Sequence, residues 1–270
     1  MTTPPTELEQ DIPELVGLAR TSVLLLDVPG APEPPTPADS SIGGPLLWPA
    51  DEPWPYCERA DHDAAWPHTT PPDHPVPTVA AVQLYAHDVP ELPFPEGTDV
   101  LQIIWCALLH DDTVDYSPVP TLYWRTAEKV RAAGILPATD VPAPAEGEYD
   151  DGFLPTARRV RPTKTREYPH QDLPDRFADA TRSRIAAAEA RHNTPYTEWC
   201  ALQTKVGGYP AWCQPPDWPS CDAGHRMEHL LSVTGEADMM MGDCGGMYFF
   251  VCPPCTTGTT MPYASRYDCH

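Results

Sequence analysis

One unusual motif occurs twice in this chain and constrains its fold more than any other feature. The first copy, SIGGPLLWPADEPWPYC, begins at Ser41, and the second, KVGGYPAWCQPPDWPSC, begins at Lys205. Aligned 164 residues apart, both copies read G-G-x3-W-x5-W-P-x-C, ending at Cys57 and Cys221. Tryptophan and cysteine are rare residues, so chance is a poor explanation for this match. The motif therefore indicates an internal duplication.

The segments that follow each copy also correspond. The first copy precedes TVAAVQLYAHDVPEL (78–92) and DVLQIIWCAL (99–108), and the second precedes MEHLLSVTGEADM (227–239) and GGMYFFVCPPC (245–255). Each pair consists of two apolar runs, rich in β-branched and aromatic residues, around a loop of glycine, proline and aspartate. Such runs predict buried strands of a hairpin. A repeat of this length is too long for a solenoid unit, so we expect two related lobes.

The predicted fold is α+β and mainly β, with two related lobes from an internal duplication and a partly helical connecting region. An N-terminal helix and a proline-rich linker are assigned to residues 1–40, and the first β lobe to 41–110. The connecting region is 111–203, and the second β lobe, with its cysteine-rich end, is 204–270. Within the connecting region, TLYWRTAEKVRAAG (121–134) predicts a strand that passes into a helix, and 175–193 predicts a second helix.

Charge and composition exclude several classes of function. The chain carries 39 acidic and 17 basic residues, a formal charge of −22, which disfavours binding to nucleic acid or to anionic membranes. No segment approaches the roughly 18 apolar residues of a membrane span, and the N-terminus lacks the features of a secretory signal. The nine cysteines are therefore expected to be reduced thiols or metal ligands in a cytoplasmic protein.

The quoted motifs resemble the YwqG-like family of bacterial proteins, a domain-of-unknown-function family, and in particular its actinobacterial branch with a cysteine-rich C-terminal end. The likeness runs from about Ser40 to the C-terminus and includes GHRMEHLLSV (224–233) and REYP (166–169). The C-terminal pattern is also similar, more faintly, to the programmed cell death protein 2 group, which is associated with chaperoning of ribosomal proteins. The resemblance implies a fold but no established activity.

The cysteine-rich end predicts a metal site. Cys252 and Cys255 form a C-x2-C knuckle after a predicted strand, a spacing at which two thiolates can bind one zinc ion. Cys221 is a natural third ligand, because the hairpin would return Cys252 towards it. The resemblance supplies the fourth ligand, since relatives also end near a cysteine. The predicted zinc ligands are Cys221, Cys252, Cys255 and Cys269, with His225 and His229 as substitutes.

Two observations limit this prediction. Ala223 stands where relatives have a further cysteine, so buried reduced cysteines remain the alternative to a structural zinc ion. The first copy has WCALLH (105–110) where the second has VCPPC (251–255), so we predict a degenerate first site without metal.

The evenly spaced His62, His68 and His74 lie in a proline-rich loop and are predicted to be solvated.

The motif itself admits two interpretations. Gly-Gly allows positive φ and close backbone approach, and the tryptophans provide large apolar bodies with an N–H group. In the structural interpretation each copy is a loop that closes one edge of a β lobe. In the functional interpretation four side chains line an aromatic and proline-rich groove for a peptide or protein. These are Trp48, Trp54, Trp212 and Trp218.

The sequence contains no recognised catalytic motif, and we assign no catalytic residue. The leading hypothesis is a non-enzymatic cytoplasmic factor that binds another protein, as an adaptor, a chaperone or an immunity-type protein. A basic partner is one alternative, given the acidic surface. The competing hypothesis is a hydrolase-type enzyme with an active site in a cleft between the lobes.

Overall fold

The computed structural model describes residues 7–28, 34–111, 113, 116–170, 172–173, 179–235, 239–242 and 245–268. The strands are β1 (Arg20–Asp27), β2 (Ser41–Ile42), β3 (Tyr56–Cys57), β4 (Val76–Pro77), β5 (Val79–Tyr85), β6 (Val100–Cys106), β7 (Val119–Arg125), β8 (Arg158–Glu167), β9 (Lys205–Gly207), β10 (Glu228–Thr234), β11 (Gly246–Val251) and β12 (Tyr263–Asp268). The α-helices are α1 (Leu8–Asp11), α2 (Ala127–Ala133) and α3 (Asp179–His192). Short 3-10 turns span Pro13–Leu15, Ala138–Asp140, Asp151–Phe153, Tyr196–Trp199 and Pro253–Cys255.

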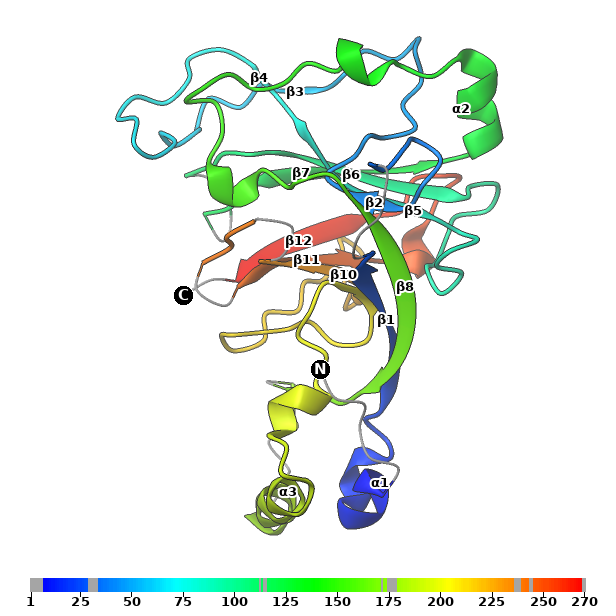
Figure 1. Cartoon of the computed structure of the whole chain (residues 1–270), viewed down its shortest axis with the longest axis vertical. Helices are drawn as coiled ribbons and strands as arrows, with labels where there is room; N and C mark the ends of the chain where they lie inside the picture. The colour runs from blue at the N-terminus through cyan, green and yellow to red at the C-terminus, as the bar shows by residue number, and fades with distance from the viewer. Residues whose placement is uncertain are drawn as a thin grey trace.

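The strands form one large antiparallel sheet of ten strands in the order β12-β11-β10-β9-β1-β8-β2-β5-β6-β7, and β3 pairs with β4 beside it (Figure 1). The two halves of the sheet pack face to face, because side chains of β5, β6, β10 and β11 belong to one buried cluster. The edge strands also meet, since the Tyr263 hydroxyl of β12 donates to the Pro120 carbonyl of β7 at 3.3 Å. The sheet is therefore nearly closed around its core, and the predicted mainly β fold is confirmed.

The predicted hairpins are present. β5 pairs with β6, and β10 pairs with β11, each with a register irregularity near the start of its first strand, between Ala80 and Val82 and between His229 and Leu231. β7 followed by α2, and the later helix α3, match the elements predicted within 121–134 and 175–193. Local apolar patterns were sufficient to identify these elements.

The two copies of the motif occupy corresponding positions in the sheet. In the first, β2 lies between β5 and β8, with Ile42 opposite Val82. In the second, β9 lies between β10 and β1, with Val206 opposite Leu231. The glycine pairs that follow share one backbone conformation, with φ of 75° and 79° at residues 43 and 44 and 67° and 70° at 207 and 208. A Cβ on Gly208 would lie 1.5 Å from the Glu167 carboxylate, which explains the need for glycine there.

Two central strands were not predicted from the sequence. β1 pairs along its whole length with β8 in the middle of the sheet, within residues assigned to the N-terminal helix and linker and to the connecting region. β8 reads RRVRPTKTRE and lacks the alternation of apolar and polar residues that identifies a strand. It forms a strand because β1 and β2 flank it on both sides.

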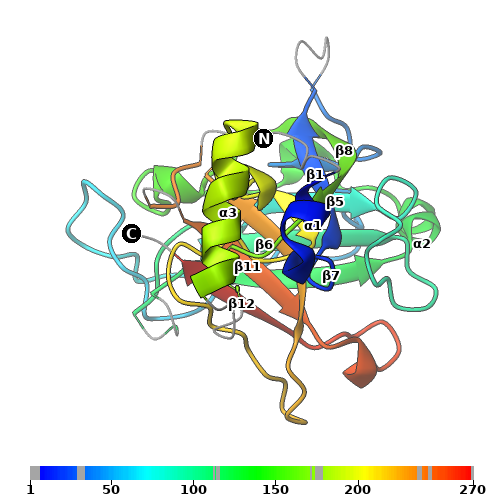
Figure 2. The same ribbon diagram turned by 90° about the horizontal axis from the view of Figure 1, so that it is seen from below.

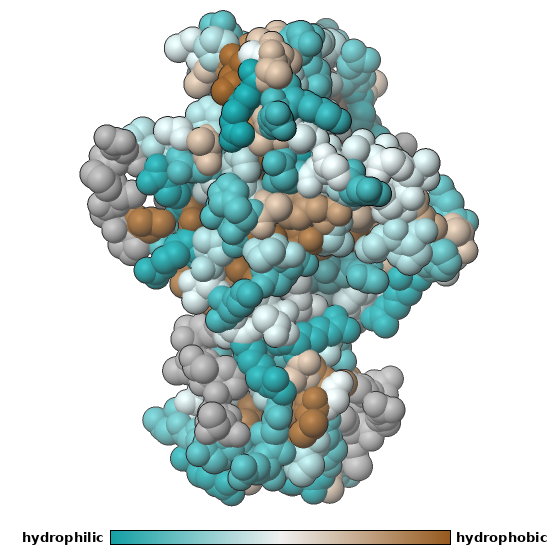
Figure 3. All heavy atoms as spheres, turned by 90° about the vertical axis from the view of Figure 1, so that its right-hand side faces the viewer, coloured by the Kyte–Doolittle hydropathy of each residue, from teal (hydrophilic) through white to brown (hydrophobic). Residues whose placement is uncertain are grey.

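α1 and α3 lie together at one end of the molecule, away from β3, β4 and α2 (Figures 1 and 2). Their buried side chains share a small core with Tyr168 and Trp199. Arg184 and Arg191 of α3 pair with acidic residues beside or within α1, and both side chains stay partly exposed. On the face of the molecule shown in Figure 3, hydrophilic residues cover most of the surface and hydrophobic residues appear as separate patches.

Candidate metal centres

Three of the four predicted cysteine ligands converge with a histidine near the C-terminal end of the sheet. Cys221 ends the second motif, Cys252 follows β11, Cys255 ends the following 3-10 turn, and His225 lies in the loop before β10. We call these four residues the C-terminal cluster. One ligand atom from each lies within 4.8 Å of all the others. The cluster can therefore hold one metal ion.

The spacing within the C-terminal cluster matches tetrahedral coordination. Two thiolates about 2.3 Å from one zinc ion would lie about 3.8 Å apart, and a thiolate and an imidazole nitrogen about 3.6 Å apart. The observed distances are 3.9 Å between the Cys221 and Cys255 sulfurs, 3.3 Å from His225 Nδ1 to Cys255 Sγ, and 3.6 Å from the same nitrogen to Cys252 Sγ.

Two tight turns position these ligands. The Cys221 N–H donates to the His225 carbonyl at 2.9 Å, which closes the first turn, and the Cys255 N–H donates to the Cys252 carbonyl at 3.0 Å, which closes the second. The prolines between Cys252 and Cys255 favour this turn, because their φ is restricted. Burial raises the pKa of the Cys221 thiol, but hydrogen bonds from the His225 backbone and from Cys252 outweigh it and lower that pKa to about 7.

The remaining C-terminal predictions fare differently. Cys269, the expected fourth ligand, lies outside the described residues, and the substitute His225 occupies the cluster instead. The other substitute, His229, points elsewhere: its ring contacts the Gly207 carbonyl and the Ser232 hydroxyl, each at 3.0 Å. The sequence predicted His225 only as a substitute ligand, because the spacing of histidines in a loop does not show which way each ring points.

A second convergence occurs in the first half of the chain, where we predicted no metal. Cys57, His62, Cys106 and His110 are all buried, and one ligand atom from each lies within 4.8 Å of the others. We call these four residues the N-terminal cluster. The prediction of a degenerate first site without metal stays a prediction, although four side chains that could hold an ion meet there. The prediction that His62 is solvated is wrong, because it is only 4% exposed. The sequence feature that could have indicated this cluster is the spacing C-x4-H from Cys57 to His62 together with C-x3-H from Cys106 to His110.

The tryptophans of the motif are mostly interior. Trp48 and Trp212 are almost completely buried, and each packs against the second tryptophan of its own motif, with ring centroids 5.0 Å and 6.5 Å apart. Trp54 is 7% exposed and touches an apolar pocket of about 250 Å³, whereas Trp218 is half-buried and lines a polar pocket of about 430 Å³. Trp54 and Trp218 line separate pockets, and the burial of Trp48 and Trp212 favours the structural interpretation. A groove lined by all four side chains stays a prediction.

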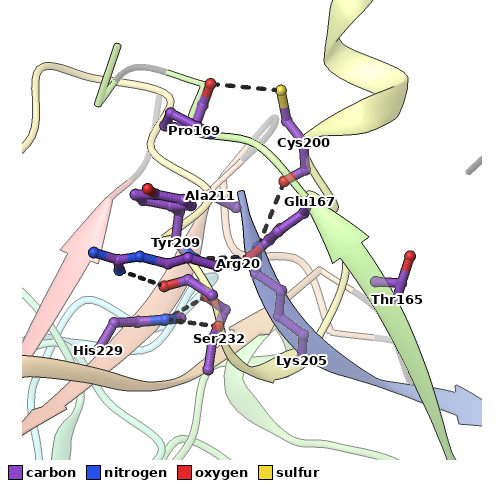
Figure 4. Close-up of polar contacts among 12 residues, drawn as sticks. Arg20, Thr165, Glu167, Pro169, Cys200, Lys205, Tyr209, Ala211, His229 and Ser232 are labelled. Atoms are coloured by element: carbon purple, nitrogen blue, oxygen red, sulfur yellow. Dashed lines mark hydrogen bonds and ion pairs between the residues drawn. The ribbon is translucent and has the colours of Figure 1, made fainter. Parts of the chain in front are cut away.

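A buried polar network lies beside the second motif (Figure 4). The Lys205 ammonium donates to Glu167 Oε2 at 2.5 Å, and both side chains are completely buried. The other Glu167 oxygen accepts the Tyr209 backbone N–H at 2.8 Å. Burial raises the pKa of Glu167 to about 7 and lowers that of Lys205. The network is closed to solvent, so its first role is to tie the end of β8 to β9 and the glycine pair, across the β1 strand that lies between them.

A family model described as a domain of unknown function, DUF1963, matches residues 40–254. The chain belongs to the DUF1963 family. The matched region contains the whole N-terminal cluster and all of the C-terminal cluster except Cys255, which follows it by one residue. No curated protein matches this DUF1963 chain. None of the helices in its described residues is long and apolar enough to cross a membrane.

Proposed function

We propose that this protein is a zinc-stabilised, non-enzymatic factor that binds a basic segment of another protein. The zinc part of the proposal is supported by the C-terminal cluster, whose three sulfurs and one imidazole nitrogen have the spacing of a tetrahedral zinc site. An ion held there would tie the end of the second motif to the segment after β11. Its role would be structural, because all four positions are taken by protein ligands.

Cysteine substitution tests the zinc assignment. Cys252→Ser should lower the zinc content by one ion per chain, because it removes a thiolate from the C-terminal cluster. Cys200→Ser is the matched control, since Cys200 is also buried but bonds only backbone carbonyls. Elemental analysis of the purified variants gives the stoichiometry. An unchanged zinc content in Cys252→Ser would contradict the assignment.

The protein-binding part rests on the exposure of Trp66. This residue lies in the loop between β3 and β4, and its side chain is 87% exposed, which is exceptional for a tryptophan. The same loop carries the fully exposed carboxylate of Asp73, and the exposed carboxylate of Glu146 lies 4.0 Å from His68, two residues after Trp66. An exposed aromatic anchor among carboxylates suits a partner segment with Lys or Arg beside an apolar residue.

Binding of short Lys/Arg-rich peptides tests this surface. Trp66→Ala should weaken binding at least about tenfold, because tryptophan anchors commonly contribute more than 1.4 kcal/mol. Glu146→Lys should weaken it as well and reduce its dependence on salt. Val16→Ala is the control, an exposed apolar residue near the α1 end of the molecule. Titration calorimetry measures all three variants, and equal affinity of Trp66→Ala and Val16→Ala would refute the site.

A hydrolase is the second candidate, and one contact favours it. The Gly207 carbonyl can only accept, so His229 Nδ1 donates to it and His229 Nε2 accepts the Ser232 hydroxyl proton. This is the arrangement of a serine nucleophile and its base. However, Ser232 is completely buried, and burial lowers the pKa of His229 to about 3, which makes it a weak base. We expect no labelling of Ser232 by a fluorophosphonate probe, and labelling lost in Ser232→Ala would favour the enzyme.

The proposal also includes an internal duplication, a more specific place in the family and a location in the cell. Corresponding registers and glycine conformations in the two halves of the sheet support an internal duplication. The quoted motifs support a place among YwqG-like proteins of actinobacteria. The described cysteines form no disulfide, which supports a reducing compartment such as the cytoplasm.

A further inference from the structure

We infer that Cys57, His62, Cys106 and His110 bind a second zinc ion, in a site enclosed by the protein. Cys57 lies in β3 and Cys106 ends β6, so the site joins the small sheet to the large one. The two histidines face each other across an isolated β-bridge, with ring centroids 4.8 Å apart. Backbone hydrogen bonds from Asp63 to Leu109 and from Asp111 to Asp61 hold the two loops together. The ligand positions are thus set by backbone pairing.

The His62 ring provides an independent reason to expect a ligand. It is 4% exposed, and neither of its ring nitrogens has a hydrogen-bond partner. A buried imidazole without partners carries a free-energy cost, which native proteins rarely accept without a function. A metal ion among the four side chains would engage this ring.

His110 is already oriented as a metal ligand. Its Nδ1 lies 3.2 Å from the Ser117 carbonyl, which can only accept, so this nitrogen carries the proton. Nε2 therefore presents its lone pair, 3.5 Å from Cys57 Sγ, close to the roughly 3.6 Å expected for two ligands of one tetrahedral zinc ion. A histidine that donates its other N–H to a carbonyl is the usual arrangement around protein-bound zinc.

The charges of the two clusters fit their different environments. Two thiolates and two neutral imidazoles around Zn²⁺ give a net charge of zero, which suits a site in which all four ligands are buried. Three thiolates and one imidazole leave one negative charge, which needs contact with solvent, and His225 of the C-terminal cluster is exposed. The mixed sulfur and nitrogen donors favour zinc over magnesium or calcium, which prefer oxygen.

The second ion has a structural consequence for the loop between β3 and β4. His62 precedes Trp66 by four residues, so a metal at His62 would fix the base of the segment that carries the exposed tryptophan. The link to partner binding rests on the proposed function, whereas the metal site itself does not.

Zinc stoichiometry in paired variants tests the inference. The native chain should hold two ions, Cys252→Ser and Cys106→Ser one each, and the double variant none. X-ray absorption of the Cys252→Ser chain should show two sulfurs at about 2.3 Å and two nitrogens at about 2.0–2.1 Å around its remaining ion. A native chain with one ion and a metal-free Cys252→Ser chain would overturn the N-terminal site and leave the C-terminal one intact. A native chain with one ion that is lost in Cys106→Ser but kept in Cys252→Ser would overturn the C-terminal site and leave the N-terminal one intact.

His62→Phe gives a second test that does not depend on the survival of a cysteine variant. In a metal-free protein this change removes an unpaired buried imidazole and should leave the melting temperature unchanged or raise it. In a zinc site it removes a ligand, so the zinc content should fall by one ion and the melting temperature should drop. His68→Phe, in the same loop but partly exposed, is the control and should change neither quantity. Full zinc content together with undiminished stability in His62→Phe would overturn the proposal.

Discussion

Replacing Lys205 by methionine should destabilise the protein by about 3–5 kcal/mol, because it leaves a buried carboxylate without its cation. Lys205 and Glu167 are both completely buried, and the carboxylate is held in place by the Tyr209 backbone N–H as well as by the ammonium group. Urea unfolding at neutral pH measures the loss. Lys164→Met is the matched control, since Lys164 lies in β8, the strand that carries Glu167, pairs with Glu91 and is largely exposed. Its substitution should cost no more than about 1 kcal/mol.

The cost of Lys205→Met should grow with pH. Burial raises the pKa of Glu167 above its value of 4.5 in the unfolded chain, and it does so even beside Lys205. Without the lysine the folded pKa rises further. A group whose folded pKa is raised stabilises the protein below its unfolded pKa, and this stability is lost as pH rises through the folded pKa. The free energy of unfolding of the variant should therefore be closest to that of the native protein near pH 4.5. By pH 8 the variant should be clearly less stable than the native protein.

A double variant separates the ion pair from the packing of the lysine stem. Glu167→Gln keeps an oxygen for the Tyr209 N–H but removes the charge, so Glu167→Gln with Lys205→Met should recover most of the lost stability. If the double variant is no more stable than Lys205→Met alone, the loss comes from packing and the electrostatic explanation fails.

Removal of metal should loosen the two halves of the sheet in a fixed order. With EDTA, the ion of the C-terminal cluster should leave first, because His225 is exposed, whereas every ligand of the N-terminal cluster is buried. Hydrogen exchange should then increase around 219–227 and 252–262 before it increases in β5 and β6. The free energy of binding one structural zinc ion reaches about 10–16 kcal/mol in zinc-finger peptides. Even a fraction of this is large against a total stability of about 5–15 kcal/mol.

The kinetics of zinc release provide the measurement. A chromogenic chelator should report two phases, of which Cys252→Ser retains only the slow one and Cys106→Ser only the fast one. Release in a single phase, or exchange that rises first in β5 and β6, would contradict this order. Readdition of zinc should restore the protection, which distinguishes metal loss from irreversible unfolding.

Short-range patterns in the sequence accounted for much of the fold and for part of the site. The hairpins of β5 with β6 and β10 with β11 follow from apolar runs bounded by breakers, and the knuckle at Cys252 follows from the spacing of two cysteines and two prolines. These features depend on residues close together in the chain, so local stereochemistry is enough to predict them. The glycine pairs can be predicted in the same way, because a positive φ depends on the residue at that position and not on distant contacts.

The sequence by itself therefore determined the repeated motif, the strands that follow it and three residues of one candidate metal centre. Only the tertiary structure decided that β1 and the polar β8 lie at the centre of the sheet, and that Lys205 is buried against Glu167. It also decided that His62 and His110 face each other with Cys57 and Cys106. The reason is physical: these groups are separated along the chain and meet through strand pairing, and the direction of a loop side chain depends on what packs against it.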